Sequence, residues 1–178
     1  PEVKAMGEAN GWTEEETMVR LKTNYDGYHF CRSNMVDVYN PFSLVNALAD
    51  KDIKNYWATS GATSLLLKFV DDMEIKLTDY DHSAILSTII ETSDVTGGGA
   101  ELFLYQSGYL TIKGYMNGLY LLGFPNHEVR QALYETVLPA LAMRKRGDIQ
   151  SAQAYLYMHI IDNRYTEPFK ADKRKVIA

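Results

Sequence analysis

Residues 105–129, YQSGYLTIKGYMNGLYLLGFPNHEV, carry the signals for a helix end, a tight hairpin and a helix start. Gly108 follows an apolar run and suits the left-handed residue that commonly ends a helix. Asn117-Gly118 lies between two apolar runs, and Asn-Gly favours a hairpin because both turn positions need positive φ. The segment therefore predicts a helix over 100–107, strands over 109–115 and 119–124, and a helix that Pro125-Asn126 caps.

The helix after residue 126 should face a core. Val129, Leu133, Val137 and Leu141 recur every four residues, as on the buried stripe of a helix. Helix, hairpin and helix follow one another in the order of a winged-helix unit, which we place at residues 99–146.

Charge argues against DNA binding by this unit. Between Thr92 and Asn126 the sequence has a single basic residue, Lys113. A DNA-binding surface needs several basic side chains to contact phosphates. Nucleic acid is therefore a less favoured partner than another part of a larger protein.

Helix and turn signals also organise the first fifty residues. Thr13-Glu14-Glu15-Glu16 is a capping box and predicts a helix that runs to Lys22. Asp26-Gly27 predicts a turn that leads into a short strand, and residues 35–39 alternate like a strand. Asn40-Pro41 predicts the start of a helix over 42–48.

The middle of the chain is less regular. A helix should start near Ser60 or Thr63 and run through 65–70, whose apolar residues, interrupted by Lys68, are too continuous for a surface helix and predict a place in the core. Residues 71–81 are acidic and broken, and 82–90 are apolar on one side. Glycines 97–99 predict a flexible joint. Neither GxxxxGK[ST] nor a GxGxxG after a strand occurs, so the chain contains no phosphate-binding loop of these types.

Composition describes an ordinary folded protein. Of 178 residues, 46% are hydrophobic and 23% are charged, and the net charge of −5 gives no basic field that would attract a polyphosphate. Cys31 is the only cysteine, and no run of 18 apolar residues occurs. We expect a cytoplasmic protein without membrane contact, and the start at Pro1 suggests a piece of a longer polypeptide. The predicted fold is α+β and mainly helical, with a helical part at 11–95, the winged part at 99–146 and a helical tail at 147–178.

Several motifs together resemble one protein family. They are YDGYHF (25–30), VYNPFS (38–43), YW (56–57), TS (59–60), LLL (65–67), LYQSGYLTI (104–112) and GFPNHEV (123–129). In this order, from about Trp12 to Leu141, they are similar to the later part of the AAA-ATPase-like proteins. Those bacterial and archaeal proteins resemble P-loop ATPases and typically end in a PD-(D/E)XK nuclease-like domain.

The resemblance implies a lid-side segment without a catalytic site. In the family, the Walker motifs lie upstream of the YDGY segment, and residues 147–178 resemble the opening of the nuclease-like domain before its catalytic strands. It implies ATP and Mg²⁺ as cofactors of the parent protein and none for this chain. The implied partners are the upstream P-loop domain and the downstream nuclease-like domain of the same polypeptide, and the oligomeric state stays open.

Other residues could carry chemistry of their own. Glu74-Ile75-Lys76 fits the E-x-K half of a metal-dependent nuclease site, with the other carboxylate among Asp52, Asp71 and Asp72. This triplet is common by chance. Asp79, Asp81 and His82 form an incomplete metal-ligand pattern, for which a solvated loop is the better interpretation.

Histidine and cysteine give no catalytic pattern. His29, His127 and His159 are scattered, and Cys31 close to His29 is expected to be a buried or half-buried thiol. The thirteen tyrosines could stack on bases, but their amphipathic positions favour core and rim roles.

The YDGY segment is the strongest candidate for a functional role. It can be a packing turn, but Asp26 and His29 are polar groups inside an aromatic cluster and could sense the nucleotide state of a neighbouring domain. Arg20, Arg32 and Arg130 are candidate sensor arginines, because lid arginines of P-loop ATPases commonly touch the γ-phosphate.

The sequence therefore assigns no catalytic, cofactor-binding or metal-binding residue. The leading hypothesis is a non-catalytic lid and linker that couples a nucleotide-binding domain to a nuclease-like effector. The alternatives are a winged-helix module that delivers nucleic acid to that effector, and a free-standing hydrolase that uses Glu74 and Lys76.

Overall fold

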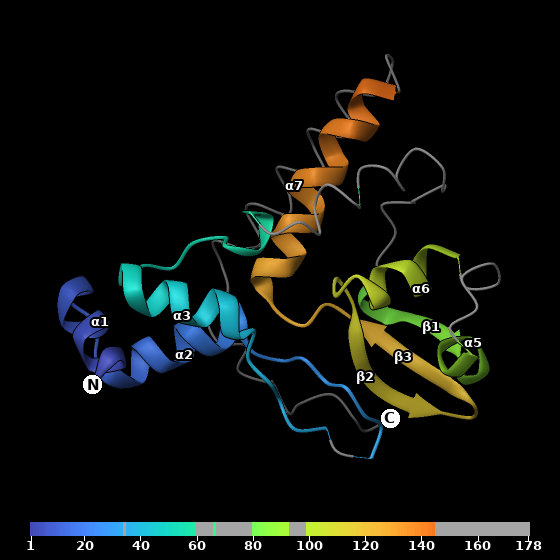
Figure 1. The fold of residues 1–178 in the computed structure, drawn as a ribbon, viewed down its shortest axis with the longest axis horizontal. Helices are drawn as coiled ribbons and strands as arrows, with labels where there is room; N and C mark the ends of the chain where they lie inside the picture. Colours follow the sequence, from blue (N-terminus) through green and yellow to red (C-terminus); the bar gives the residue numbers. More distant parts are fainter. Residues whose placement is uncertain (34, 60–65, 67–79, 93–98, 145–178) are drawn as a thin grey trace, which may run out of the picture. The chain divides into compact units, whose positions relative to one another are not determined.

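The computed structural model describes residues 1–33, 35–59, 66, 80–92 and 99–144, and the contacts below are those of these residues. The fold is α+β and mainly helical, as the sequence predicts. The chain divides into two compact units, Pro1–Val137 and Leu138–Ala178. The first unit contains the α1–α3 helices, the three-stranded sheet and the beginning of α7 (Figure 1).

Three helices form the N-terminal core. They are α1 (Glu2–Asn10), α2 (Glu14–Tyr25) and α3 (Pro41–Asp50). Met6, Leu21, Tyr25 and Ala47 are buried where the three helices meet. Removal of this apolar surface from water holds the three helices together.

The helix starts agree with the sequence signals. In the Thr13 capping box, the Glu16 amide donates to Thr13 Oγ1 over 3.1 Å, and the Thr13 amide donates to Glu16 Oε2 over 2.8 Å. Asn40 Oδ1 caps α3 by accepting from the amides of Phe42 and Ser43. The predicted helix end at Lys22 is wrong by three residues, because Leu21 and Tyr25 share the buried face of α2 and extend its packing by a turn.

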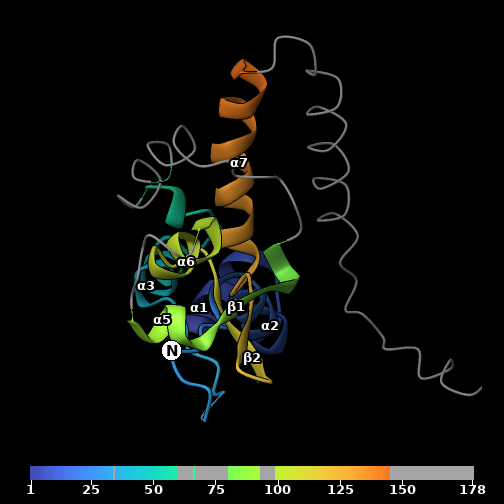
Figure 2. The same cartoon turned by 90° about the vertical axis from the view of Figure 1, so that its right-hand side faces the viewer.

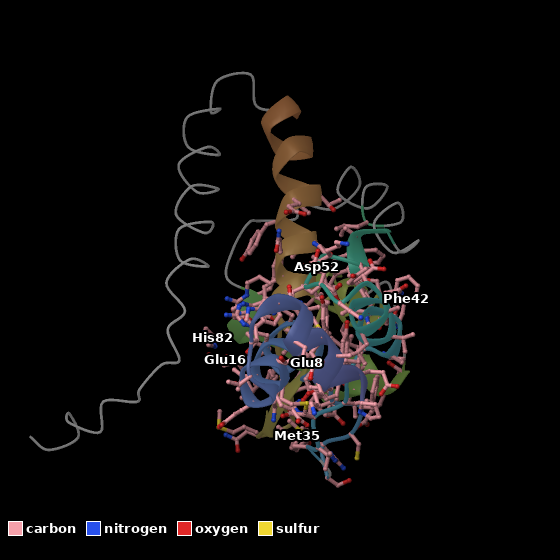
Figure 3. All side chains as sticks on the ribbon, turned by 90° about the vertical axis from the view of Figure 1, so that its left-hand side faces the viewer. Glu8, Glu16, Met35, Phe42, Asp52 and His82 are labelled. Carbon is pink, nitrogen blue, oxygen red and sulfur yellow. The ribbon has the colours of Figure 1, made fainter. Side chains whose placement is uncertain are left out.

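The strand predicted at 35–39 is not formed. An isolated antiparallel bridge joins Tyr28 and Val38 instead, with two backbone hydrogen bonds of 3.1 Å. The apolar side chains of Met35, Val36 and Val38 are exposed, so no buried face holds this segment in a sheet. Met35 and Phe42 are seen on the outside of the molecule in Figure 3.

The sheet has three antiparallel strands in the order β1-β3-β2. They are β1 (Ser83–Leu86), β2 (Thr111–Met116) and β3 (Leu119–Gly123). Asn117 and Gly118 join β2 to β3 with φ of 52° and 81°, which confirms the predicted turn. Sequence analysis did not predict β1, whose four residues become a strand by pairing with β3.

Helices flank the sheet strands along the chain. Two short elements, η2 (Tyr80–His82) and α5 (Ser87–Thr92), come before and after β1. Helix α6 (Gly99–Gln106) lies against β1, as the view in Figure 2 shows. Gly108 follows it with φ of 81°, which confirms the predicted left-handed residue at this helix end.

Helix α7 (His127–Arg144) follows the hairpin. Val129, Leu133 and Val137 are almost fully buried, so this part of the predicted stripe is confirmed. The side chain of Leu141 lies outside the described residues. The order α6, hairpin, α7 is the helix–hairpin–helix order that the sequence predicts, and the boundary between the two compact units falls within α7.

Several predicted features lie outside the described part of the chain. They are most of the 65–70 helix, the acidic 71–79 segment, the joint before Gly99 and the 147–178 tail. Leu66 alone is described in the first of these, and it is helical and fully buried. Among the described helices, none combines the length and the apolar character that crossing a membrane requires. The proposed domain boundaries stay predictions.

Two turn glycines should differ in how they tolerate a side chain. In Gly118→Ala we expect a loss of about 1–2 kcal/mol in the free energy of unfolding, because only the positive φ is strained. In Gly27→Ala we expect a larger loss, because φ is +98° and the new Cβ would lie 2.3 Å from the Pro125 carbonyl oxygen. Urea denaturation of both variants measures the difference. Equal losses would contradict close packing of residue 27 against residue 125.

Candidate functional site

The two tyrosines of the YDGY segment bond to different parts of the chain. The Tyr25 hydroxyl accepts from the Lys54 amide over 3.1 Å and donates to the Lys54 carbonyl over 2.9 Å. Burial raises the pKa of Tyr25 to about 12. The Tyr28 hydroxyl donates to the Gly108 carbonyl over 3.2 Å, and burial also raises the pKa of Tyr28. The segment therefore connects the N-terminal helices to the start of the hairpin.

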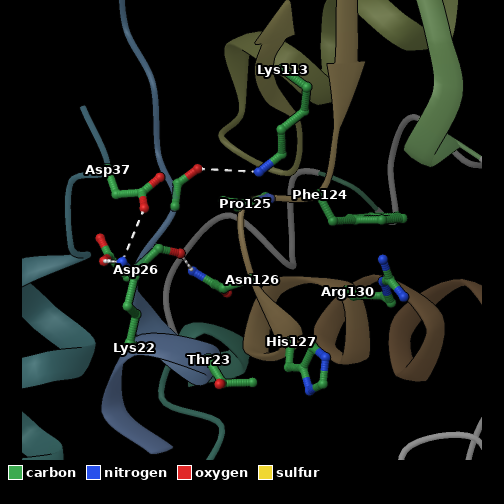
Figure 4. A pocket seen from close by; sticks show the side chains of 11 residues that line it. Lys22, Thr23, Asp26, Asp37, Lys113, Phe124, Pro125, Asn126, His127 and Arg130 are labelled. Atoms are coloured by element: carbon green, nitrogen blue, oxygen red, sulfur yellow. Dashed lines mark hydrogen bonds and ion pairs between the residues drawn. The ribbon is translucent and has the colours of Figure 1, made fainter. Parts of the chain in front are cut away.

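Asn126 joins the end of α2 to the start of α7. Its Nδ2 donates to the Asp26 carbonyl over 3.1 Å, and its Oδ1 accepts from the Val129 amide over 3.1 Å. The first of these bonds is drawn in Figure 4. Asp26 and Asn126 are both buried, and the Asp26 Oδ2 atom lies 4.0 Å from Lys22 Nζ. One amide side chain thus caps α7 and holds the YDGY turn.

His29 lies between two hydrogen-bond acceptors. Its Nδ1 is 2.8 Å from the Ile112 carbonyl oxygen, and its Nε2 is 2.9 Å from Asp37 Oδ1. Although burial raises the pKa of Asp37, hydrogen bonds from His29 and Lys22 outweigh it and lower this pKa. The Ile112 carbonyl and the ionised Asp37 carboxylate are both acceptors, and each lies within hydrogen-bond distance of one ring nitrogen.

The backbone of His29 is also tied to β2. The His29 amide donates to Thr111 Oγ1 over 2.8 Å, and the Thr111 hydroxyl donates to the His29 carbonyl over 2.9 Å. These two bonds and the ring contact at Ile112 fix the loop against the hairpin.

Glu128 supports a second connection. Its Oε1 accepts from the amides of Tyr56 and Trp57 over 2.7 and 3.0 Å, which holds η1 (Trp57–Thr59) at the first turn of α7. Glu128 is 3% exposed. Burial raises its pKa, and the hydrogen bonds that it accepts only partly offset this effect.

A pocket of about 430 Å³ lies beside the YDGY turn (Figure 4). Its lining residues come from α2, the turn, the loop before α3, β2 and the start of α7. They are Lys22, Thr23, Asp26, Gly27, Asp37, Lys113, Phe124, Pro125, Asn126, His127 and Arg130. Burial lowers the pKa of Lys113, and burial together with Arg130 lowers the pKa of His127.

The three candidate sensor arginines have different surroundings. Arg20 lies over the Trp12 ring at 4.4 Å, and Arg32 lies over the Tyr115 ring at 4.8 Å. Arg130 forms an ion pair with Asp81 and lines the pocket. Of the three, therefore, Arg130 is the one that belongs to the candidate site.

Cys31 and His29 do not form a nucleophile and base. Both ring nitrogens of His29 are engaged by Ile112 and Asp37. Cys31 is exposed, so the prediction of a buried or half-buried thiol is wrong. The described residues of the loop that carries it, 30–33 and 35–38, all have exposed side chains and offer no core in which the thiol could be buried. The Cys31 Sγ lies 2.7 Å from Ser33 Oγ.

The proposed metal patterns can be followed only in part. Glu74, Lys76, Asp71, Asp72, Asp79 and His159 lie outside the described residues. Asp81 bonds to Arg130 and to the Phe124 amide, and Asp52 accepts from the Ile53 amide and pairs with Lys54. In the described ranges, no group of three or more His, Cys, Asp or Glu side chains could hold a metal ion.

Sequence reasoning found part of this site. It singled out Asp26, His29 and Arg130, it recognised Asn126 as a cap, and it noted Lys113 as an isolated basic residue. It missed Lys22, Asp37 and Glu128 as members of the site. Their roles depend on contacts between distant segments, for which spacing along the chain gives no signal.

Comparison with known proteins gives one distant relative. The chain is 26% identical over 140 residues to the "Uncharacterized protein in vnfD 5'region" of Azotobacter chroococcum mcd 1. The match covers 72% of this chain and 26% of the relative, so the chain spans about a quarter of the relative's length. No protein-family profile matches the chain. No solved structure matches it either.

Glu128→Gln should change how stability depends on pH. The pKa of Glu128 in the folded protein lies above its ordinary value of 4.5, so the folded state binds this proton more tightly than the unfolded state. Ionisation therefore lowers the free energy of unfolding as pH rises from about 4.5 through the raised pKa. Glutamine still accepts from both amides and has no such loss. Urea denaturation between pH 4 and 7 should show that the free energy of unfolding of the variant increases relative to that of the wild type as pH rises.

Glu135→Gln is the matched control for this prediction. Glu135 lies on the same helix but is exposed, and its bonds are to Gln131 and Asn55. Its stability curve should run parallel to that of the wild type. If Glu128→Gln also runs parallel, the raised pKa is contradicted.

Proposed function

We propose that this chain is a non-catalytic lid and linker of a larger AAA-ATPase-like protein, which couples an upstream nucleotide-binding domain to a downstream nuclease-like domain. The observation that carries the proposal is the double contact of Asn126, which bonds the YDGY turn and caps α7 with one side chain. The length of the distant relative, of which the chain spans about a quarter, supports a place within a longer polypeptide.

Coupling through this contact has a physical basis. A buried hydrogen bond between neutral groups is directional, and its loss leaves unpaired polar atoms that cost about 1–3 kcal/mol each. A displacement of α2 that kept the Asn126 bond would therefore have to move the first turn of α7. Glu128 makes the same connection to residues 56 and 57. Both contacts favour movement of α2, residues 56–57 and the first turn of α7 as one body.

Geometry favours the lid role over the nucleic-acid role. Lys113, the one basic residue of the sequence between Thr92 and Asn126, donates to the Gly27 carbonyl and lines the pocket. The exposed side chains near the hairpin turn include Tyr115 and Met116, which are uncharged. The hairpin thus presents no row of cations to a phosphate backbone.

The coupling role is tested in the longer polypeptide that carries this segment. Hydrogen exchange of the α7 amides should differ between the nucleotide-free protein and the protein with a non-hydrolysable ATP analogue. Asn126→Ala should remove most of this difference, because the α7 cap no longer reports the position of the YDGY turn. Gln131→Ala, which removes an exposed bond to Glu135 on the same helix, should leave it unchanged. Equal responses in both variants would exclude coupling through Asn126.

The isolated chain should neither hydrolyse ATP nor bind DNA. Titration with labelled single- and double-stranded DNA at low and moderate salt, beside an ATPase assay, checks both expectations. DNA binding that weakens steeply with salt would favour the winged-helix alternative, because displaced counterions are the signature of phosphate contacts. Metal-dependent cleavage that Glu74→Ala abolishes would favour the hydrolase.

A further inference from the structure

We infer that the pocket beside the YDGY turn binds a small phosphate-type oxyanion, with the Lys113 ammonium as its anchoring cation. The inference concerns a ligand of this chain itself and does not depend on the lid role. It rests on the charges that line the pocket and on how each of them is paired.

Lys113 is the least compensated cation of the pocket. Its Nζ donates to the Gly27 carbonyl over 3.3 Å, and this partner is neutral (Figure 4). Within the described part of the chain, no carboxylate forms an ion pair with it, and Asp37 and Asp81 act on it only at longer range. Burial lowers its pKa, yet its side chain stays exposed to solvent, so an anion in the pocket can reach its ammonium group.

Other donors of the pocket can share the same ligand. Lys22 Nζ lies 3.3 Å from Asp37 Oδ2 and 62% of its side chain is exposed, so it can turn to a ligand. His127 begins α7, where the helix dipole favours negative charge. Its lowered pKa favours a neutral ring, which still offers one N–H donor. These groups come from three separate segments and surround one cavity.

The ligand should be small. Asp26 and Asp37 line the same pocket, and the chain as a whole carries a net charge of −5, so a long polyanion would be repelled on approach. The volume of about 430 Å³ is at the lower end of the range for small-molecule sites. An oxyanion of phosphate type presents several acceptors to Lys113, Lys22 and His127 at once.

Asp37 acts as an internal competitor. Its carboxylate lies between Lys22 and His29 at 3.3 and 2.9 Å, where it already occupies donors near the ligand position. A bound oxyanion would compete with Asp37 for Lys22, and the negative charge of Asp37 would also repel it. Neutralisation of residue 37 should therefore strengthen anion binding, whereas neutralisation of residue 113 should weaken it.

The test is an NMR titration of the whole chain with sodium phosphate and with pyrophosphate, at an ionic strength held constant with sodium chloride. The wild type should show saturable shifts at the amides of Gly27, Lys113 and His127. Lys113→Gln should weaken binding by about tenfold or more, and Lys113→Arg should restore most of it. Asp37→Asn should tighten binding by about fivefold, as expected from removal of one nearby charge at a protein surface.

Lys54→Gln is the control. Lys54 pairs with Asp50 and Asp52 and does not line the pocket, so the affinity should not change. The inference is overturned if no saturable chemical-shift change appears at tens of millimolar anion. A Kd in that range corresponds to a binding free energy of about −2 to −3 kcal/mol. It is also overturned if Lys54→Gln weakens binding as much as Lys113→Gln, or if Asp37→Asn weakens it. Retention of the native spectrum by each variant shows that lost binding does not reflect unfolding.

Discussion

The side chain of Asn126 sets the constraint on which the rest of the first unit depends. Its amide nitrogen donates to Asp26 and its amide oxygen accepts from Val129, so a single planar group fixes both the end of α2 and the beginning of α7. Both bonds lie in a buried region, where neither partner could turn to water instead. The hairpin, whose last strand ends at Gly123, is separated from this contact by two residues.

Around this contact, further polar groups join segments that lie far apart in the sequence. His29 holds the loop against β2, and Glu128 holds residues 56 and 57 against α7. Hydrogen bonds fix orientation more narrowly than apolar contacts do, because donors and acceptors must be aligned. These polar contacts thus orient the helices relative to the sheet, whereas burial of apolar surface stabilises the helices and the sheet themselves.

The sequence was informative wherever the deciding interaction is local. The Thr13 capping box, the Asn40 cap, the Asn117-Gly118 turn and Gly108 each depend on neighbours within a few residues, and each is present. The strand at 35–39 was predicted wrongly because its alternation has no buried face to meet, and β1 was missed because it exists only through its pairing with β3. The pocket belongs to the second kind, since it forms from residues that lie about ninety positions apart, such as Lys22 and Lys113.

Gly27 shows how a long-range contact limits the residue types that one position can accept. A Cβ at this residue would lie 2.3 Å from the carbonyl oxygen of Pro125, so the absence of a side chain at one site is matched to the course of the backbone at the other. Residue 27 therefore cannot gain a side chain while the backbone at residue 125 keeps its course. Among descendants of a common ancestor, a glycine at this turn and a Pro-Asn pair before the long helix should therefore be inherited together, or be lost together.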